Sequence, residues 1–215
     1  FNVDVQQRIS RQQDNAKSIG NLAWLVEHSQ AHLHTDLIFG LPGESMDSIA
    51  AGFDQLVAVR PHEIQLGLLK RLRGTPIARH TAAYGMVYGA PPPYTVLQTA
   101  ALDADTVQRL TRMARYWDLV ANSGRFKFTL PTLLLGPSAF TAFLAWSDWL
   151  WATTAATQRL TPEDLVDALF DYLTSQQERT ADEVRALLLR DYVASGARAS
   201  PACLRSVMPR PPAPV

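Results

Sequence analysis

The order of apolar and polar residues predicts a strand–helix–strand unit between residues 32 and 69. In residues 32–40 apolar and polar side chains alternate, as they do in a strand with one buried face. In residues 46–57 the apolar residues recur at helical spacing, with Ser45 placed to cap the helix and Pro61 following its end. A second alternating segment follows at residues 62–69. A unit of this length is expected to cross over right-handed and to place its two strands parallel.

The alternation also assigns the strand residues to two faces. In the first strand three apolar residues suit the face that packs on helices: Leu33, Leu37 and Phe39. The opposite face then carries His32, His34, Asp36, Ile38 and Gly40. In the second strand Ile64, Leu66 and Leu68 suit one face, and Gln65, Gly67 and Leu69 suit the other. Glycine in the middle of a strand is unfavourable, so Gly67 indicates close approach of either a ligand or a crowded interior.

The sequence Gly40-Leu41-Pro42-Gly43-Glu44 predicts a tight turn after the first strand. Glycine tolerates positive φ and lets backbone approach a ligand, while proline fixes its own φ. In α/β folds ligands bind at the carboxyl ends of strands, where this turn lies. Its spacing matches neither the dinucleotide pattern GxGxxG nor the phosphate loop GxxxxGK(S/T). A turn that binds a ligand and a turn that only connects strand to helix both remain open.

The rest of the chain divides into a mixed part and a helical part. Residues 1–11 read as a loop, residues 14–28 as a helix, residues 76–84 as a short helix and residues 86–88 as a short strand. The prolines at positions 91–93 suit a stiff connector and place a domain boundary near residue 90. Four amphipathic helices are predicted beyond it: 103–123, 138–151, 161–172 and 180–188.

The predicted fold class is therefore α/β followed by all-α. The predicted domains are residues 1–90, a helical domain at residues 91–195, and a disordered proline-rich tail at residues 196–215. The tryptophans Trp146, Trp149 and Trp151 either line a pocket or pack in the helical core.

His32, His34 and Asp36 fall on one strand face, which raises the question of a metal. Histidines at this spacing bind Zn²⁺ in some barrel enzymes, but same-face residues lie roughly 6.5–7 Å apart, so further ligands must come from elsewhere. Glu63 adjoins His62 but is expected to alternate to the opposite face. This favours buried, hydrogen-bonded histidines over a metal site.

Charge and composition narrow the classes of partner. The 20 basic and 20 acidic side chains cancel, which gives no electrostatic argument for binding nucleic acid or an anionic membrane. The single cysteine, Cys203, argues against a disulfide framework and fits a cytoplasmic location. No apolar segment approaches the roughly 20 residues of a membrane-spanning helix. Lys70, Arg71 and Arg73, after the second strand, either meet an anionic ligand or form a solvated charge cluster.

Several sequence segments carry a family resemblance. DLIFGLPGES (residues 36–45) resembles the fifth-strand segment of radical S-adenosylmethionine enzymes, and EIQLGLLKRLRGTP (residues 63–76) resembles their sixth strand. The later segments GMVYGAPPPYTVLQT, YWDLVANSGRF and LLLRDY look like a cobalamin-binding subgroup with an uncharacterised helical C-terminal domain. The resemblance covers residues 1–195. It implies the last strands of a partial (β/α) barrel joined to a C-terminal helical bundle.

The resemblance also implies a cofactor site. Ile38 and Gly40 correspond to a family motif whose apolar residue packs on the adenine of S-adenosylmethionine. The predicted cofactor-binding residues are Asp36, Ile38, Gly40, Pro42, Gly43 and Gly67. No catalytic residue and no metal ligand is predicted.

One departure from the family limits what this chain can do. The family holds a 4Fe–4S cluster with three cysteines in a CxxxCxxC loop, which this chain lacks. We therefore expect a C-terminal part that acts with an upstream part of the same polypeptide on an unknown small-molecule substrate, with cobalamin as a further cofactor if an upstream domain binds it. The alternative is a non-catalytic helical interaction domain on a βαβ scaffold, and the upstream sequence discriminates between the two.

Overall fold

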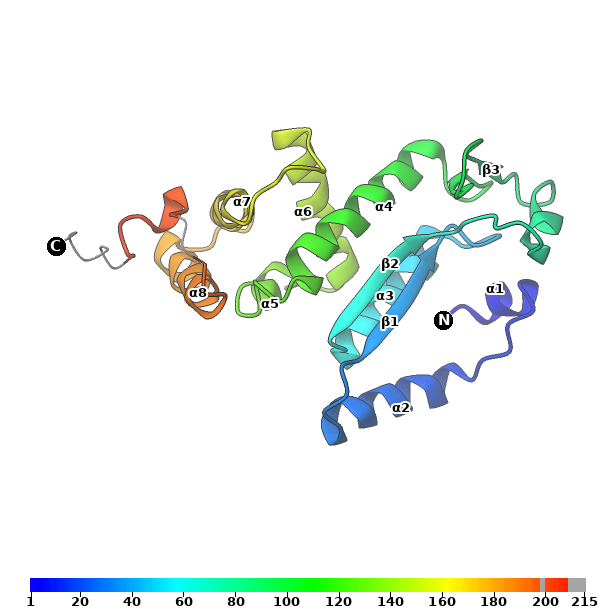
Figure 1. The fold of residues 1–215 in the computed structure, drawn as a ribbon, viewed down its shortest axis with the longest axis horizontal. Coiled ribbons are helices and arrows are strands. Elements are labelled where there is room, and N and C mark those ends of the chain that lie inside the picture. The colour runs from blue at the N-terminus through cyan, green and yellow to red at the C-terminus, as the bar shows by residue number, and fades with distance from the viewer. Residues whose placement is uncertain (198–199, 209–215) are drawn as a thin grey trace.

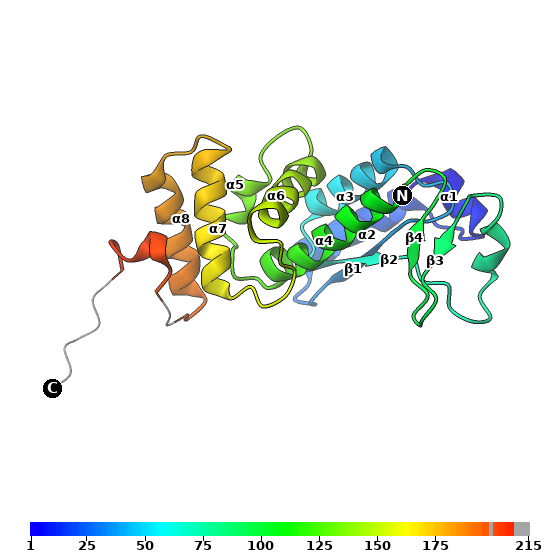
Figure 2. The same cartoon turned by 90° about the horizontal axis from the view of Figure 1, so that it is seen from above.

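The structure of this chain, a computed structural model, describes residues 1–197 and 200–208. The molecule is elongated, with the parallel strands and the first helices towards one end and the last two α-helices at the other (Figures 1 and 2). The fold combines α/β structure with a helical part, as predicted. Within the described residues, no helix is both long and apolar enough to cross a membrane.

The predicted strand–helix–strand unit is confirmed. β1 (His34–Phe39) pairs in parallel with β2 (Glu63–Leu68), and α3 (Met46–Val59) connects them. The Ser45 side chain accepts a hydrogen bond from the Ser48 backbone N–H at 3.3 Å, which caps α3 as expected. α3 and α4 (Ala104–Trp117) lie on one side of the two strands (Figure 2). The alternating apolar residues of both strands pack on that side.

The prediction of a loop at residues 1–11 was wrong in part. α1 (Val3–Arg8) begins after Asn2, whose side chain accepts the backbone N–H of Val5. Val5 is 2% exposed and Gln6 is also buried, so this helix is anchored by contacts that helical periodicity alone does not reveal. α2 (Asn15–His28) follows as predicted, capped by Asp14.

The segment between β2 and the helical part is less helical than predicted. A 3₁₀ helix, η1 (Pro76–His80), replaces the expected helix 76–84, and the Thr75 hydroxyl donates back to the Leu72 carbonyl instead of capping it. β3 (Val87–Tyr88) pairs antiparallel with β4 (Val96–Gln98), a strand that the pattern did not predict. The predicted boundary near residue 90 thus lies between two paired strands.

Among the described residues, the helical part contains the four predicted helices, an additional short α-helix and a 3₁₀ helix. α4 continues into a π-helical turn, η2 (Asp118–Asn122). The remaining elements are α5 (Leu130–Leu133), α6 (Ala139–Thr154), α7 (Pro162–Ser175), α8 (Ala181–Ala194) and the 3₁₀ helix η3 (Ala202–Leu204). α4 packs on α6, and α7 packs on α8.

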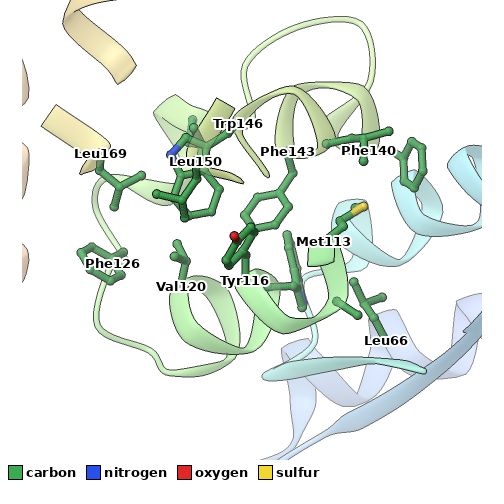
Figure 3. Packing of buried hydrophobic residues seen from close by; sticks show 14 of the residues in the cluster. Leu66, Met113, Tyr116, Val120, Phe126, Phe140, Phe143, Trp146, Leu150 and Leu169 are labelled. Carbon is green, nitrogen blue, oxygen red and sulfur yellow. The ribbon is translucent and has the colours of Figure 1, made fainter. Parts of the chain in front are cut away.

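One continuous hydrophobic cluster joins the strands to the helices. Leu66 of β2 lies near Met113 of α4, and Phe143 and Trp146 of α6 extend the cluster away from the strands (Figure 3). A hydrogen bond also connects the two parts. Asp54 of α3 accepts the backbone N–H of Phe140 in the first turn of α6 at 2.8 Å. The cluster contains residues from both sides of the predicted boundary at residue 90.

The disordered tail predicted at residues 196–215 is partly ordered. Leu204 in η3 is 0% exposed, and Asp167 of α7 accepts the backbone N–H groups of Ala202 and Cys203. This segment is held by side chains of an earlier helix, which low periodicity does not disclose. Residues 198–199 and 209–215 of the predicted tail lie outside the described residues.

Candidate functional site

The face of the β1–β2 pair opposite α3 is open. Ile38 on this face is 40% exposed, while its neighbours Leu37 and Phe39 are buried on the helix side. Ile38 lies beside Gly67 of β2 in the strand register. A Cβ atom placed on Gly67 would have no described atom within 4 Å. Ile38 and Gly67 therefore form an apolar surface with free space above it.

Polar residues flank this surface at both ends. Asp36 and Gln65 pair in the register one same-face position towards the amino ends of the strands, and both are exposed. Beyond the carboxyl end of β2, Arg71, Arg73 and Tyr94 contribute to the lining of a cavity of about 350 Å³. The Arg71 guanidinium lies 5.0 Å from the ring centre of Tyr88.

The glycine turn has the backbone geometry that its residues predict. Gly40 and Gly43 have φ values of +82° and +71°, in the left-handed region that favours glycine. The space that a Gly40 side chain would need is filled by Val96 of β4, whose Cγ1 would lie 2.8 Å from an added Cβ. The buried Pro42 offers its carbonyl oxygen to the Arg8 guanidinium of α1 at 2.6 Å. The turn is thus fixed by segments on both sides of it in sequence.

The Glu44 side chain forms a hydrogen bond with the backbone of the turn. Its side chain is buried, and Oε2 accepts the backbone N–H of Leu41 at 3.3 Å. Burial raises the pKa of Glu44 to about 7, against the opposing effect of that hydrogen bond. An internal carboxyl group therefore takes the place that an external anion would have at this turn.

The outer edge of β2 is covered by the chain itself. The side-chain amide of Asn122 accepts the N–H of Ile64 at 3.1 Å and donates to the Ile64 carbonyl at 3.0 Å, as a neighbouring strand would. Beyond the carboxyl end of β2, Val96 donates its backbone N–H to the carbonyl of Leu69 at 2.8 Å, and the N–H of Leu69 donates to Phe39 of β1. Among the described residues β1 pairs only with β2, so its other edge is open.

The histidines on this face differ from the sequence-based expectation. His32 and His34 are exposed, so the interpretation as buried histidines was wrong. Glu63 was expected on the face away from its neighbour His62, yet both approach His32: a Glu63 oxygen lies 2.9 Å from His32 Nε2, and the His62 ring centre lies 4.7 Å from that of His32. The register that pairs His34 with Glu63 explains this meeting, and the register cannot be read from either strand alone.

The predicted site residues therefore fall into two groups. Asp36, Ile38 and Gly67 share the open face, whereas Gly40, Pro42 and Gly43 form the turn at its carboxyl end. Sequence reasoning missed the residues that hold these groups in place: Arg8, Val96 and Asn122. None of these three residues stands in a local pattern that marks this role, because each contacts a segment distant in sequence.

The tryptophans of α6 divide between the two roles that the sequence left open. Trp146 is 0% exposed and packs in the core. Trp151 is 36% exposed and lines a second cavity of about 740 Å³ between α4 and β4. The Arg112 guanidinium lies 4.9 Å from the Trp151 ring centre in that cavity wall.

A family model covers more than half of the chain. The family described as "Protein of unknown function (DUF4080)" matches residues 82–210, which extend from the end of η1 through the helical part. The strands β1 and β2 and the glycine turn lie before the matched segment. No curated protein matches the chain.

Proposed function

This chain belongs to the DUF4080 family, and we propose that it supplies the last two strands of a radical S-adenosylmethionine barrel together with a helical domain. In this proposal β1 and β2 correspond to the fifth and sixth strands of the barrel, and an upstream part of the same polypeptide supplies the others. The open face of the strands then forms part of the barrel interior.

The observation that carries the proposal is the uneven covering of the β1–β2 pair. Parallel sheets are normally covered on both faces, and a pair of strands alone is only marginally stable. Here one face is covered by helices and the β2 edge is occupied at Ile64 by Asn122, whereas among the described residues the second face is open and β1 has no strand on its other edge. That is the arrangement expected of the final strands of a larger parallel sheet.

The residues on the open face fit the adenine of S-adenosylmethionine. A flat base requires an apolar wall and close approach to backbone, which Ile38 and Gly67 offer side by side. In the family that the sequence resembles, one electron from the cluster breaks the S–C5′ bond of the cofactor to give methionine and a 5′-deoxyadenosyl radical. In this chain Ile38 and Gly67 would position the base, and the turn at residues 40–44 would fix the end of β1.

The iron–sulfur cluster does not fit this chain. Three thiolates are needed in one loop, and Cys203, the only cysteine, is held against α7 by Asp167. No step is therefore assigned to residues of this chain through the cluster. Cobalamin and a small-molecule substrate belong to the proposal only through the resemblance.

The test is anaerobic reconstitution of the protein encoded by the complete gene. We expect formation of 5′-deoxyadenosine from S-adenosylmethionine in the presence of a reductant. The variant Gly67→Val places a side chain in this space, where its Cβ atom has no described atom within 4 Å, so it should lower this product about tenfold or more while the protein remains folded.

Gln65→Val is the matched control, because it places the same side chain on the same face one position towards the amino end. It should change product formation less than Gly67→Val does. Equal losses in the two variants would contradict the adenine assignment. Absence of deoxyadenosine from a reconstituted wild-type protein with an intact cluster would instead favour the non-catalytic interaction domain.

A further inference from the structure

The amino ends of β1 and β2 bring together three of the five histidines of the chain and one glutamate. His32 and His34 come from the start of β1, and His62 and Glu63 from the start of β2. The strands are parallel, and His34 is the register partner of Glu63. Two short sequences separated by about thirty residues therefore meet at the amino ends of the two strands. These lie at the end of β1 opposite the glycine turn.

Glu63 is the centre of this cluster. Its Oε1 lies 2.9 Å from His32 Nε2, and its Oε2 lies 3.0 Å from His34 Nδ1. One nitrogen from each of the two histidines and one oxygen from Glu63 all lie within 4.8 Å of one another.

These distances are close to those of a metal site. Zinc–nitrogen bonds of 2.0–2.1 Å in a tetrahedral site place neighbouring ligand atoms about 3.4 Å apart. The contacts of 2.9 and 3.0 Å involve the two different oxygens of Glu63, and with one oxygen and one nitrogen from each histidine no two ligand atoms lie further apart than 4.8 Å. The histidine side chains are 56% exposed, so they can adjust to the spacing of a metal site without disturbing the core.

His62 fixes the backbone between the two histidines. Its Nδ1 accepts the backbone N–H of Leu33 at 3.1 Å, and its ring centre lies 4.7 Å from that of His32. The peptide that separates His32 from His34 is thereby tied to the start of β2. His62 acts as a positioning residue, a role that outer residues commonly play around metal-binding histidines.

We propose that His32, His34 and Glu63 bind one divalent transition-metal ion, with Zn²⁺ as the natural probe. Two imidazoles and one carboxylate form a donor set that zinc uses, and it leaves the fourth position for water or another ligand. The nitrogen ligands disfavour Mg²⁺ and Ca²⁺, which prefer oxygen. The ion would clip the segment before β1 to the start of β2 and would stabilise the folded chain by mass action.

The experiment is a titration of the metal-free chain with Zn²⁺ by calorimetry and with Co²⁺ by visible absorption. We expect one ion per chain, a dissociation constant below about 10 µM for Zn²⁺, and Co²⁺ bands of a four- or five-coordinate site. His34→Ala and Glu63→Gln should each weaken Zn²⁺ binding about tenfold or more. Glu63→Gln retains the size and hydrogen-bonding capacity of the side chain, so its effect reports the lost charge and not a lost fold.

His28→Ala is the matched control, because His28 is an exposed histidine at the end of α2 and does not belong to the cluster. It should bind Zn²⁺ as the unaltered chain does. Equal weakening in His28→Ala and His34→Ala would overturn the proposal, as would the absence of Co²⁺ bands. Binding only in the millimolar range would likewise show that the cluster is a hydrogen-bonded network and not a metal site.

Discussion

Gly40, which directly follows β1, and Gly67 of β2 have opposite structural requirements. Gly40 has a φ of +82° and a Val96 methyl group where its side chain would be, while Gly67 has open space in the same direction. A position can therefore require glycine for its backbone conformation or for the empty space beside it. Only the first requirement affects the stability of the folded chain. In the proposed function, Gly67 is the glycine whose role depends on a ligand.

Gly40→Ala should lower the free energy of unfolding by about 2–4 kcal/mol, because it combines a left-handed φ with a side-chain clash. Gly67→Ala should leave it unchanged or raise it slightly, since alanine loses less backbone entropy on folding. Urea unfolding of both variants measures the difference. Similar losses in the two variants would show that the space above Gly67 is filled.

Glu44 makes the stability of the glycine turn depend on pH. Its pKa is raised to about 7 in the folded state, so the folded chain binds this proton more tightly than the unfolded chain does. The contribution of Glu44 to the free energy of unfolding is largest below the pKa of the unfolded chain, near 4.5, and is lost as the pH rises towards 7.

Glu44→Gln should therefore match the unaltered chain at pH 4.5 and exceed its unfolding free energy by roughly 3 kcal/mol at pH 8. Urea unfolding across this range is the measurement. Glu27→Gln, at an exposed position of α2, is the control and should keep the pH dependence of the unaltered chain. An unchanged slope in Glu44→Gln would contradict the assignment to Glu44.

At the scale of elements, some side chains make hydrogen bonds to backbone groups that a neighbouring strand or helical turn would usually make. Asn122 pairs with both backbone groups of Ile64, and Asp191 of α8 accepts the backbone N–H groups of Phe128 and Thr129. Each contact joins segments more than fifty residues apart.

Asn122→Ala should expose the Ile64 amide, which then loses its acceptor. Its hydrogen-exchange protection should fall about tenfold or more, as expected when about 1.4 kcal/mol of local stability is lost. The Leu69 amide, which donates to the Phe39 carbonyl within the strand pair, is the internal reference and should change less. An unchanged Ile64 amide would mean that another group covers this edge.

Asp191→Ala should lower the unfolding free energy by about 3 kcal/mol, because it leaves two backbone N–H groups near Thr129 without their acceptor. Asp182→Ala on the same helix is the control, since the Asp182 side chain is 99% exposed. Unfolding in guanidinium chloride measures the unfolding free energy of both variants. A loss in Asp182→Ala as large as that in Asp191→Ala would remove the special role of the buried carboxylate.

These contacts also explain what the sequence could and could not predict. Periodicity and capping residues predict β1, α3, β2 and the long helices, because those signals lie within the element itself. α1 and β4 depend on partners distant in sequence, as does the ordered segment around Leu204. The same holds for the site, since the face of Ile38 follows from alternation whereas the meeting of His32 with Glu63 requires the register.

For the whole molecule, the continuous core predicts cooperative unfolding. Phe53 of α3 meets Trp117 of α4 with ring centres 4.8 Å apart, and Trp117 meets Phe143 of α6 at 4.9 Å. Loss of either the strands or the helices would expose these rings. We therefore expect one transition in which tryptophan fluorescence and far-ultraviolet circular dichroism change together. Two separated transitions would instead support independent domains that meet near residue 90.

The amide of Asn122 has a consequence for how copies of this chain can associate. In this chain by itself, without the upstream strands proposed above, the described β1–β2 sheet offers the β1 edge to another strand, whereas Asn122 occupies the β2 edge at Ile64. Two copies that join edge to edge use up both available edges, and a third finds no place. Growth through these strands therefore stops at a pair and cannot propagate into a fibre.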